Sequence, residues 1–79
     1  MEYESQKNTV LGYLKDHEYI NDMICYYEFF ITDLQHAIYE LRKEGYPITD
    51  KWVHTRNKRG QYRKYKNYML EESYKWKVQ

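Results

Sequence analysis

One helix with a defined beginning and a defined end restricts the fold of this chain more than any other feature. Apolar side chains recur over residues 34–41 at the i, i+3, i+4, i+7 spacing of a single helical face. Ahead of them, Thr32 and Gln35 form a T-x-x-Q capping box, in which each side chain can satisfy the other's backbone donor. Gly45 can adopt the left-handed conformation at C′, and the proline two residues later cannot continue a helix. The sequence therefore predicts a helix over 32–44.

Two shorter helices are expected upstream of this one. The first runs from Ser5, its expected N-cap, or Gln6 to Asp16, around a narrow apolar stripe. A short extended link follows at Tyr19–Ile20. The residues that form the stripe are Val10, Leu11 and Leu14.

The second helix is expected from Asn21 to about Phe29. Asn21 is a favourable N-cap residue, and Asp22 complements the positive end of the helix. Apolar and aromatic residues follow at helical spacing and cover a wide arc of this short element. An arc this wide predicts either burial on more than one side or an exposed apolar patch.

The second half of the chain predicts a β-hairpin. Residues 52–56 are rich in β-branched and aromatic side chains, and residues 62–70 form the returning strand. Between them, residues 57–60 are a turn signal in which Gly60 is free to take a positive φ. Tyr65 breaks the alternation of the returning strand, which predicts a bulge or an edge position that re-aims one ring.

Three helices followed by a two-stranded ribbon constitute the plan of an α+β winged helix-turn-helix domain. Seventy-nine residues are enough for one domain with a small core, so residues 1–79 are interpreted as a single domain. We assign no structure to the tail at 71–79. Only a few residues separate the two central helices, as a helix-turn-helix requires.

The charge of the chain is strongly segregated, although its net value is only +1. All seven charged side chains within residues 51–70 are basic, whereas residues 1–50 carry ten acids against four bases. A basic stripe of this density predicts contact with a polyanion, of which nucleic acid is the commonest. An acidic protein surface and simple protection of a strand edge by charge remain open as alternatives.

Double-stranded DNA is the polyanion we expect, contacted through its backbone by the basic hairpin. Gln35 and His36 on the third helix would add weak base reading, although for Gln35 a role confined to the capping box is equally open. Tyr62, Tyr65 and Tyr68 interleave the cations as in a stacking surface for bases, but packing of Tyr65 and Tyr68 on Trp52 is the favoured interpretation. The backbone contacts are assigned to Arg56, Lys58, Arg59, Arg63, Lys64 and Lys66.

Four aromatic residues, Tyr26, Tyr27, Phe29 and Phe30, lie at the end of the second helix. We expect them in the core, because a small winged domain needs aromatic rings between its helices and its ribbon. The alternative is an exposed aromatic patch that binds a protein or forms a homodimer.

Several classes of function are not expected. Cys25 is the one cysteine, which excludes an internal disulfide and fits a reducing cytoplasm. His17, His36 and His54 have no metal-ligand spacing to it, and neither a catalytic set nor a glycine-rich phosphate loop is evident. The acidic N-terminus lacks the regions of a signal peptide, and no apolar run is long enough for a membrane. We expect no enzyme activity, cofactor, metal or small-molecule ligand.

The sequence resembles small winged helix-turn-helix proteins encoded by phages and prophages of Gram-positive bacteria. The resemblance covers nearly the whole chain and implies the fold together with DNA binding. The matching positions are Gln6, Val10, Leu11, Tyr13–Lys15, His17, Ile20, Thr32, Ile38–Ile48, Trp52, Arg59, Gly60, Arg63, Tyr65, Tyr68 and Leu70.

This chain departs from the family pattern at the helix that would read DNA. The family commonly places basic residues where this sequence has Asp33 and Ala37, and a glycine where it has Phe30. A carboxylate at the N-terminus of such a helix repels phosphates, although it can accept a hydrogen bond from a cytosine amino group. The departures imply that the wing has kept its basic residues while the reading helix has lost them.

Two hypotheses follow from these patterns. In the first, the chain is a phage-type DNA-binding protein that acts as a transcriptional regulator or as an architectural or excision factor. In the second, the scaffold binds and inhibits a host nucleic-acid-binding protein, as an anti-CRISPR protein or an inhibitor of transcription would. The residues assigned to that interface are Tyr26, Tyr27, Phe30, Asp33 and Glu40.

Overall fold

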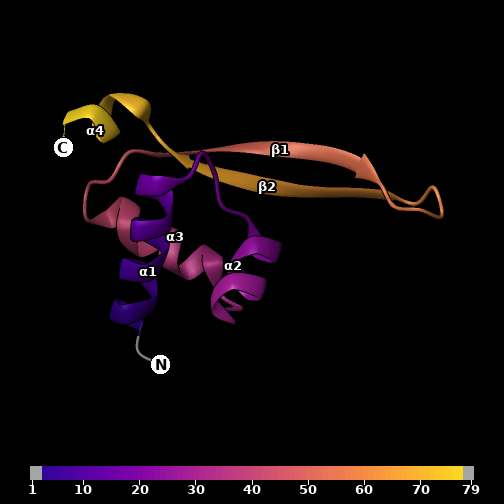
Figure 1. Cartoon of the computed structure of the whole chain (residues 1–79), viewed down its shortest axis with the longest axis horizontal. Helices are drawn as coiled ribbons and strands as arrows, with labels where there is room; N and C mark the ends of the chain where they lie inside the picture. Colours follow the sequence, from indigo (N-terminus) through magenta and orange to yellow (C-terminus); the bar gives the residue numbers. More distant parts are fainter. Residues whose placement is uncertain (1–2, 78–79) are drawn as a thin grey trace.

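A helical body and a long hairpin that projects from it make up the molecule (Figure 1). The computed structural model describes residues 3–77. The extents of the molecule along its principal axes are 42, 30 and 20 Å, and the hairpin lies along the longest. The elements follow one another as α1 (Tyr3–Asp16), α2 (Asp22–Phe29), α3 (Leu34–Lys43), β1 (Ile48–Arg56), β2 (Tyr62–Leu70) and α4 (Glu72–Lys77).

The first two helices lie close to their predicted positions. The predicted helix from Ser5 or Gln6 begins earlier, at Tyr3, so Ser5 lies inside α1 and its assignment as the N-cap was wrong. Asn21 does cap α2, because its side-chain oxygen accepts a hydrogen bond from the Ile24 amide at 2.9 Å.

The helix predicted over 32–44 is present as α3, but its N-cap is a different residue. The Asp33 carboxylate accepts a hydrogen bond from the His36 amide at 3.2 Å, so the capping box expected from Thr32 and Gln35 was wrong. A carboxylate one residue closer to the helix takes the place that the threonine hydroxyl was expected to fill. The helix accordingly starts at Leu34.

The end of α3 follows the sequence signal. Gly45 has φ +101°. Its amide donates to the Arg42 carbonyl at 3.0 Å, and the Tyr46 amide donates to the Leu41 carbonyl at 3.1 Å. This pair of hydrogen bonds is the Schellman arrangement, in which the residue at C′ must be left-handed. The predicted stop is confirmed.

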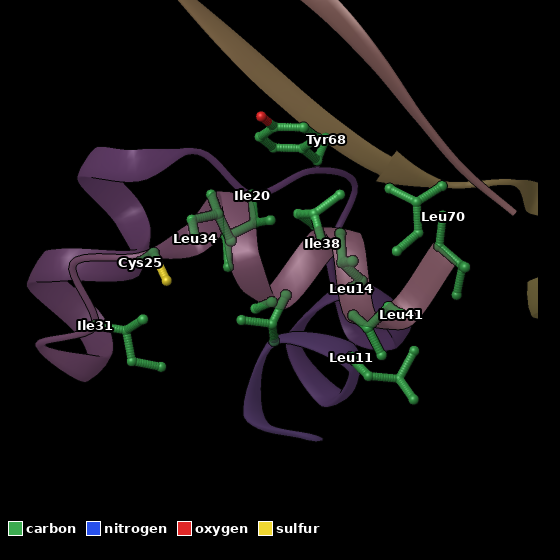
Figure 2. Packing of buried hydrophobic residues seen from close by; sticks show 13 residues of the cluster. Leu11, Leu14, Ile20, Cys25, Ile31, Leu34, Ile38, Leu41, Tyr68 and Leu70 are labelled. Atoms are coloured by element: carbon green, nitrogen blue, oxygen red, sulfur yellow. The ribbon is translucent and has the colours of Figure 1, made fainter. Parts of the chain in front are cut away.

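The core lies between α1, α3 and the base of the hairpin (Figure 2). Burying one leucine or isoleucine side chain contributes about 1.5–3 kcal/mol, so this cluster supplies the main favourable term in a chain this short. Its members are Val10, Leu11, Leu14, Ile20, Cys25, Ile31, Leu34, Ala37, Ile38, Leu41, Ile48, Tyr68 and Leu70.

The hairpin is longer and more regular than the sequence suggested. β1 starts four residues before the predicted Trp52, and β1 pairs with β2 in an unbroken antiparallel register from Ile48–Leu70 to Arg56–Tyr62. Within this register every residue has a single partner, so the expected bulge at Tyr65 was wrong. Gly60 in the turn has φ +80°, as predicted.

The link between α1 and α2 joins the outer edge of β2. Ile20 and Tyr68 exchange two backbone hydrogen bonds, at 2.9 and 2.8 Å. The Asn21 amide group then donates to the side-chain oxygen of Asn67 at 3.0 Å. These contacts fix the hairpin on the helical body beside the start of α2. Beyond β2, α4 lies at the end of the hairpin opposite the turn (Figure 1), where Tyr74 packs edge-on against Tyr46.

Candidate nucleic-acid interface

The hairpin of residues 48–70, hereafter the wing, has two faces of different composition. Residues paired across an antiparallel ladder point to the same side of the ribbon. The register therefore divides the outer half of the wing into two sets of side chains. One face carries Trp52, His54, Arg56, Tyr62, Lys64 and Lys66, and the other carries Lys51, Val53, Thr55, Arg63, Tyr65 and Asn67.

This division separates the tyrosines that the sequence had grouped. Tyr65 shares a face with Val53, on the side away from Trp52, and Tyr68 lies in the core. The expectation that Tyr65 packs on Trp52 was therefore wrong. Tyr62, Tyr65 and Tyr68 do not form one stacking surface either, because Tyr62 lies on the Trp52 face and Tyr68 is buried.

The first face of the wing is organised around Trp52. This ring is 48% exposed, and the ammonium groups of Lys64 and Lys66 lie 4.9 and 5.0 Å from its centroid. Cation–π contacts of this length hold two flexible side chains close to the ribbon. The result is a partly ordered pair of positive charges beside an exposed aromatic surface.

The tip of the wing holds further cations around a rigid turn. The Asn57 side-chain oxygen accepts hydrogen bonds from the amides of Arg59 and Gln61, at 2.9 and 3.0 Å. Arg56 donates to the Gly60 carbonyl at 2.8 Å. Lys58 and Arg59 are exposed at the turn, and Arg63 and Lys64 are exposed on β2. The predicted backbone-contacting residues therefore lie on an exposed element with a fixed turn.

The helix α3 presents fewer free polar groups. The Gln35 side chain lies close to the Tyr68 hydroxyl, and both residues line the same groove. Burial raises the pKa of Tyr68, and the interaction with Gln35 opposes that rise. His36 is half-buried in the first turn, where Asp33 is the cap, and Ala37 is 1% exposed. Of the two residues predicted to read DNA bases, Gln35 lies beside Tyr68 of the wing, and His36 is half-buried.

A groove of about 290 Å³ separates α3 from the first face of the wing. Its lining combines the helix and the strand, and it includes Tyr39, which is 60% exposed and has the Lys43 ammonium 5.8 Å from its ring. Nothing in the sequence indicated that Tyr39 belongs to this site, because the spacing within the helix does not show which of its sides lies next to the wing. The groove is lined by Gln35, Ile38, Tyr39, Arg42, Lys66 and Tyr68.

Arg42 joins the floor of this groove to β1. Its Nε donates to the Ile48 carbonyl at 3.0 Å, and its Nη2 donates to Asp50 at 2.9 Å. The guanidinium also lies 5.9 Å from the centroid of the Tyr68 ring. The Arg42 hydrogen bond, together with the positive charges of Lys66 and Arg42, lowers the pKa of Asp50, although burial opposes this. Arg42 thus fixes the angle between helix and wing.

The other face of the wing looks onto the first turn of α2. A mainly apolar groove of about 430 Å³ lies between them. Met23, which is 63% exposed, and Tyr65 line it together with Arg63 and Asp22. The groove separates the outer part of the wing from the start of α2.

The aromatic residues at the end of α2 are not core residues, with one exception. Phe29 is half-buried, and its ring meets Tyr13 edge-on with 5.7 Å between centroids. Tyr26, Tyr27 and Phe30 are 47, 70 and 77% exposed, so the prediction that these three would fill the core was wrong. The hairpin joins the body through the Ile20 link, on the other side of α2, and leaves these rings uncovered.

The residues assigned to a protein interface are only partly brought together. The Tyr26 ring lies 5.6 Å from that of Tyr27 and 6.0 Å from that of Phe30, both edge-on. Asp33 is exposed at the N-terminus of α3, and Glu40 is half-buried two turns further along the same helix. The aromatic residues form one cluster, and the two acids are spread along α3.

Other kinds of site find no support in residues 3–77. No group of three or more potential metal ligands occurs in this part of the chain. Burial, with a smaller effect from the negative charge of Asp22, raises the pKa of the Cys25 thiol to about 11, so it is protonated at neutral pH and unreactive. No helix within the same residues is long and apolar enough to cross a bilayer.

Three helices with a helix-turn-helix at their centre, followed by an antiparallel two-stranded hairpin, define the winged helix-turn-helix class. The family model for the winged helix-turn-helix domain matches residues 5–73, so the chain belongs to this family. The family is typically DNA-binding and non-enzymatic, which makes DNA the partner that membership indicates. No curated protein and no solved structure matches the chain.

Proposed function

We propose that this protein binds double-stranded DNA mainly through its wing, with little selectivity for sequence. The observation that carries the proposal is the uninterrupted basic charge of residues 51–70 on an exposed, rigidly turned hairpin. Contacts to phosphates fix the orientation of a protein on DNA, whereas contacts to base edges carry the sequence information. The wing carries seven basic side chains that can contact phosphates. Groups that can contact base edges are scarce on α3, where His36 is half-buried and Ala37 is buried.

The biological setting we propose is a phage or prophage of a Gram-positive bacterium, within the cytoplasm of the host. Low intrinsic specificity suits an architectural or excision factor that works beside a sequence-specific partner, and it also suits a small regulator that needs such a partner. In each case the backbone contacts come from Arg56, Lys58, Arg59, Arg63, Lys64 and Lys66. Gln35 and His36 then contribute only weakly to base reading.

The test is a DNA titration over a range of salt concentrations. Replacement of Arg59 and Arg63 together by Glu removes two phosphate contacts and adds two repulsive charges. The affinity for a duplex should fall by about 100-fold or more, and the slope of log K against log salt should become shallower by about 2. Fluorescence anisotropy with a labelled duplex measures both quantities.

A matched pair of single variants separates the effect of the wing from that of net charge. Arg59→Glu and Lys15→Glu change the net charge equally, and both side chains are exposed, but Lys15 lies on α1. Only Arg59→Glu should weaken binding strongly. Equal losses for the two variants, or an unchanged salt slope in the Arg59/Arg63 double variant, would contradict binding through the wing.

A second candidate function is favoured by the exposed rings of Tyr26, Tyr27 and Phe30. An aromatic cluster next to carboxylates fits a basic protein surface, so the scaffold would inhibit a host nucleic-acid-binding protein, with Asp33 and Glu40 at its margin. The distinguishing experiment is recovery of host proteins on immobilised chain after nuclease treatment. A partner retained without nucleic acid, and lost with Tyr27→Ala, supports the inhibitor; recovery only through DNA contradicts it.

A further inference from the structure

The end of α2 carries an apolar surface that the fold itself leaves uncovered. The three rings of Tyr26, Tyr27 and Phe30 touch one another edge-on and point into solvent. Large aromatic side chains gathered in this way are enriched at protein interfaces and depleted from surfaces that bind nothing. We refer to these three residues, with the exposed carboxylate of Glu28 on the same helix, as the acidic face.

The backbone at Phe30 points to a role for the exposed ring. Phe30 has φ +57° and ψ +27°, a left-handed conformation that is strained for a bulky side chain and ordinary for glycine. The ring is 77% exposed, so little burial compensates for the strain. Residues held in such conformations cluster at functional sites. A glycine would make the same turn with less strain, and it would lack the ring.

The charge around the rings excludes a polyanion as the occupant. From Asp16 to Leu41 the chain carries six acids and neither lysine nor arginine. Nucleic acid would therefore meet a segment with a net negative charge and no lysine or arginine. A surface with cations and apolar groups would instead meet complementary charge, and its cations could lie over the tyrosine and phenylalanine rings.

This chain carries such a surface itself. The wing has seven cations and no acid between residues 51 and 70, and its first face exposes Trp52 and Tyr62 between lysines. Within one molecule only the first turn of α2, with Asp22, lies across a groove from the wing. In Figure 1, α2 starts beside the hairpin, where Asn21 bonds Asn67, and its C-terminal end points away.

We propose that the acidic face of one copy docks the wing of a second copy, in a head-to-tail arrangement. A two-fold pairing of acidic face with acidic face would oppose like charges, and so would a pairing of wing with wing. In this head-to-tail arrangement a single acidic face meets a single wing, so each pair leaves one free wing and one free acidic face at its ends. Since the wing is also the proposed DNA contact, a duplex and a second copy compete for it.

The experiment is sedimentation velocity of the full chain without DNA, over protein concentrations from about 10 µM to about 1 mM. At low salt the weight-average mass should rise above the 10.0 kDa monomer and return to it at high salt. Phe30→Gly should remove the association while raising the melting temperature by several degrees, so loss of folding cannot explain the result. Glu71→Lys, an exposed charge reversal outside both surfaces, is the control and should leave association intact.

Mixing two defective variants tests the head-to-tail geometry. Glu28→Lys damages the acidic face and keeps the wing, whereas Arg59→Glu with Arg63→Glu damages the wing and keeps the acidic face. Each alone should stay monomeric, and their mixture should form a heterodimer that grows no further, because one complementary pair of surfaces remains.

Three results would overturn the proposal: a monomer at every concentration, association that survives Phe30→Gly, or a mixture that stays monomeric. A monomer throughout would leave the acidic face for a basic host protein. Because the assay contains no DNA, its outcome is independent of whether the wing binds a duplex.

Discussion

The helix α3 and the wing flank the same groove but present different chemistry to it. The first turn of α3 is capped by a carboxylate, and its glutamine lies beside Tyr68 in the groove. The wing holds its cations on an exposed ribbon, and two of them lie over the Trp52 ring. The difference teaches that affinity and specificity are separable properties of one interface. In the proposed function, the wing provides the groups for affinity, and α3 provides few of those for specificity.

The largest predicted effect follows from removing the contacts that join α3 to the wing. Arg42→Ala removes the hydrogen bond to the Ile48 carbonyl and the ion pair with Asp50. The free energy of unfolding should fall by about 1–2 kcal/mol, because a hydrogen bond to a charged group and a partly exposed ion pair are lost together. DNA affinity should fall as well, since the wing is no longer held at a fixed angle to α3.

Lys43→Ala is the control for that measurement. It removes a neighbouring cation that lies over the Tyr39 ring, and it should change the stability by less than about 0.5 kcal/mol. Denaturant titration followed by tryptophan fluorescence measures both variants. Equal stability losses would show that Arg42 does not act as the link.

Neutralising the carboxylate at the start of α3 should have a smaller effect. Asp33→Asn keeps a good N-cap and removes one negative charge from the N-terminus of α3. We expect a duplex to bind about 2- to 5-fold more tightly, as fits the removal of one screened repulsion near phosphates. Anisotropy titration at low salt measures the gain. Tighter binding to one sequence only would show that α3 reads bases after all.

The smallest predicted effect is the pH dependence of the stability that the Arg42–Asp50 ion pair contributes. The pKa of Asp50 is lowered in the folded protein, first by the Arg42 hydrogen bond, so its stabilisation is fully present above the unfolded value near 3.8. It is lost as the pH falls through the lower folded value. Chemical denaturation between about pH 5 and pH 2 should therefore show a steeper decline for the wild type than for Asp50→Asn. Parallel curves for the two proteins would contradict the assignment.

The sequence showed the difference in chemistry between the wing and α3 only in part. The basic run and the position of Asp33 are matters of composition and spacing, so both could be read directly. The N-cap was assigned to Thr32 because a capping box is a local pattern, whereas in the folded chain Asp33 accepts from the His36 amide and the helix starts one residue later. The length and regularity of the hairpin were missed at its base, where Asp50 interrupts the apolar pattern but pairs with Arg42.

The sequence by itself determined the order of the elements, the stop of α3 at Gly45 and the turn of the wing, because these depend on local backbone preferences and on side-chain periodicity. It also determined the segregation of charge.

Only the tertiary structure decided which aromatic side chains are covered. The Ile20–Tyr68 bridge places the hairpin on one side of α2, which puts Tyr68 in the core and leaves Tyr26, Tyr27 and Phe30 in solvent. Burial depends on contacts between residues far apart in the chain, and periodicity within one helix cannot tell which of its sides a distant strand will cover.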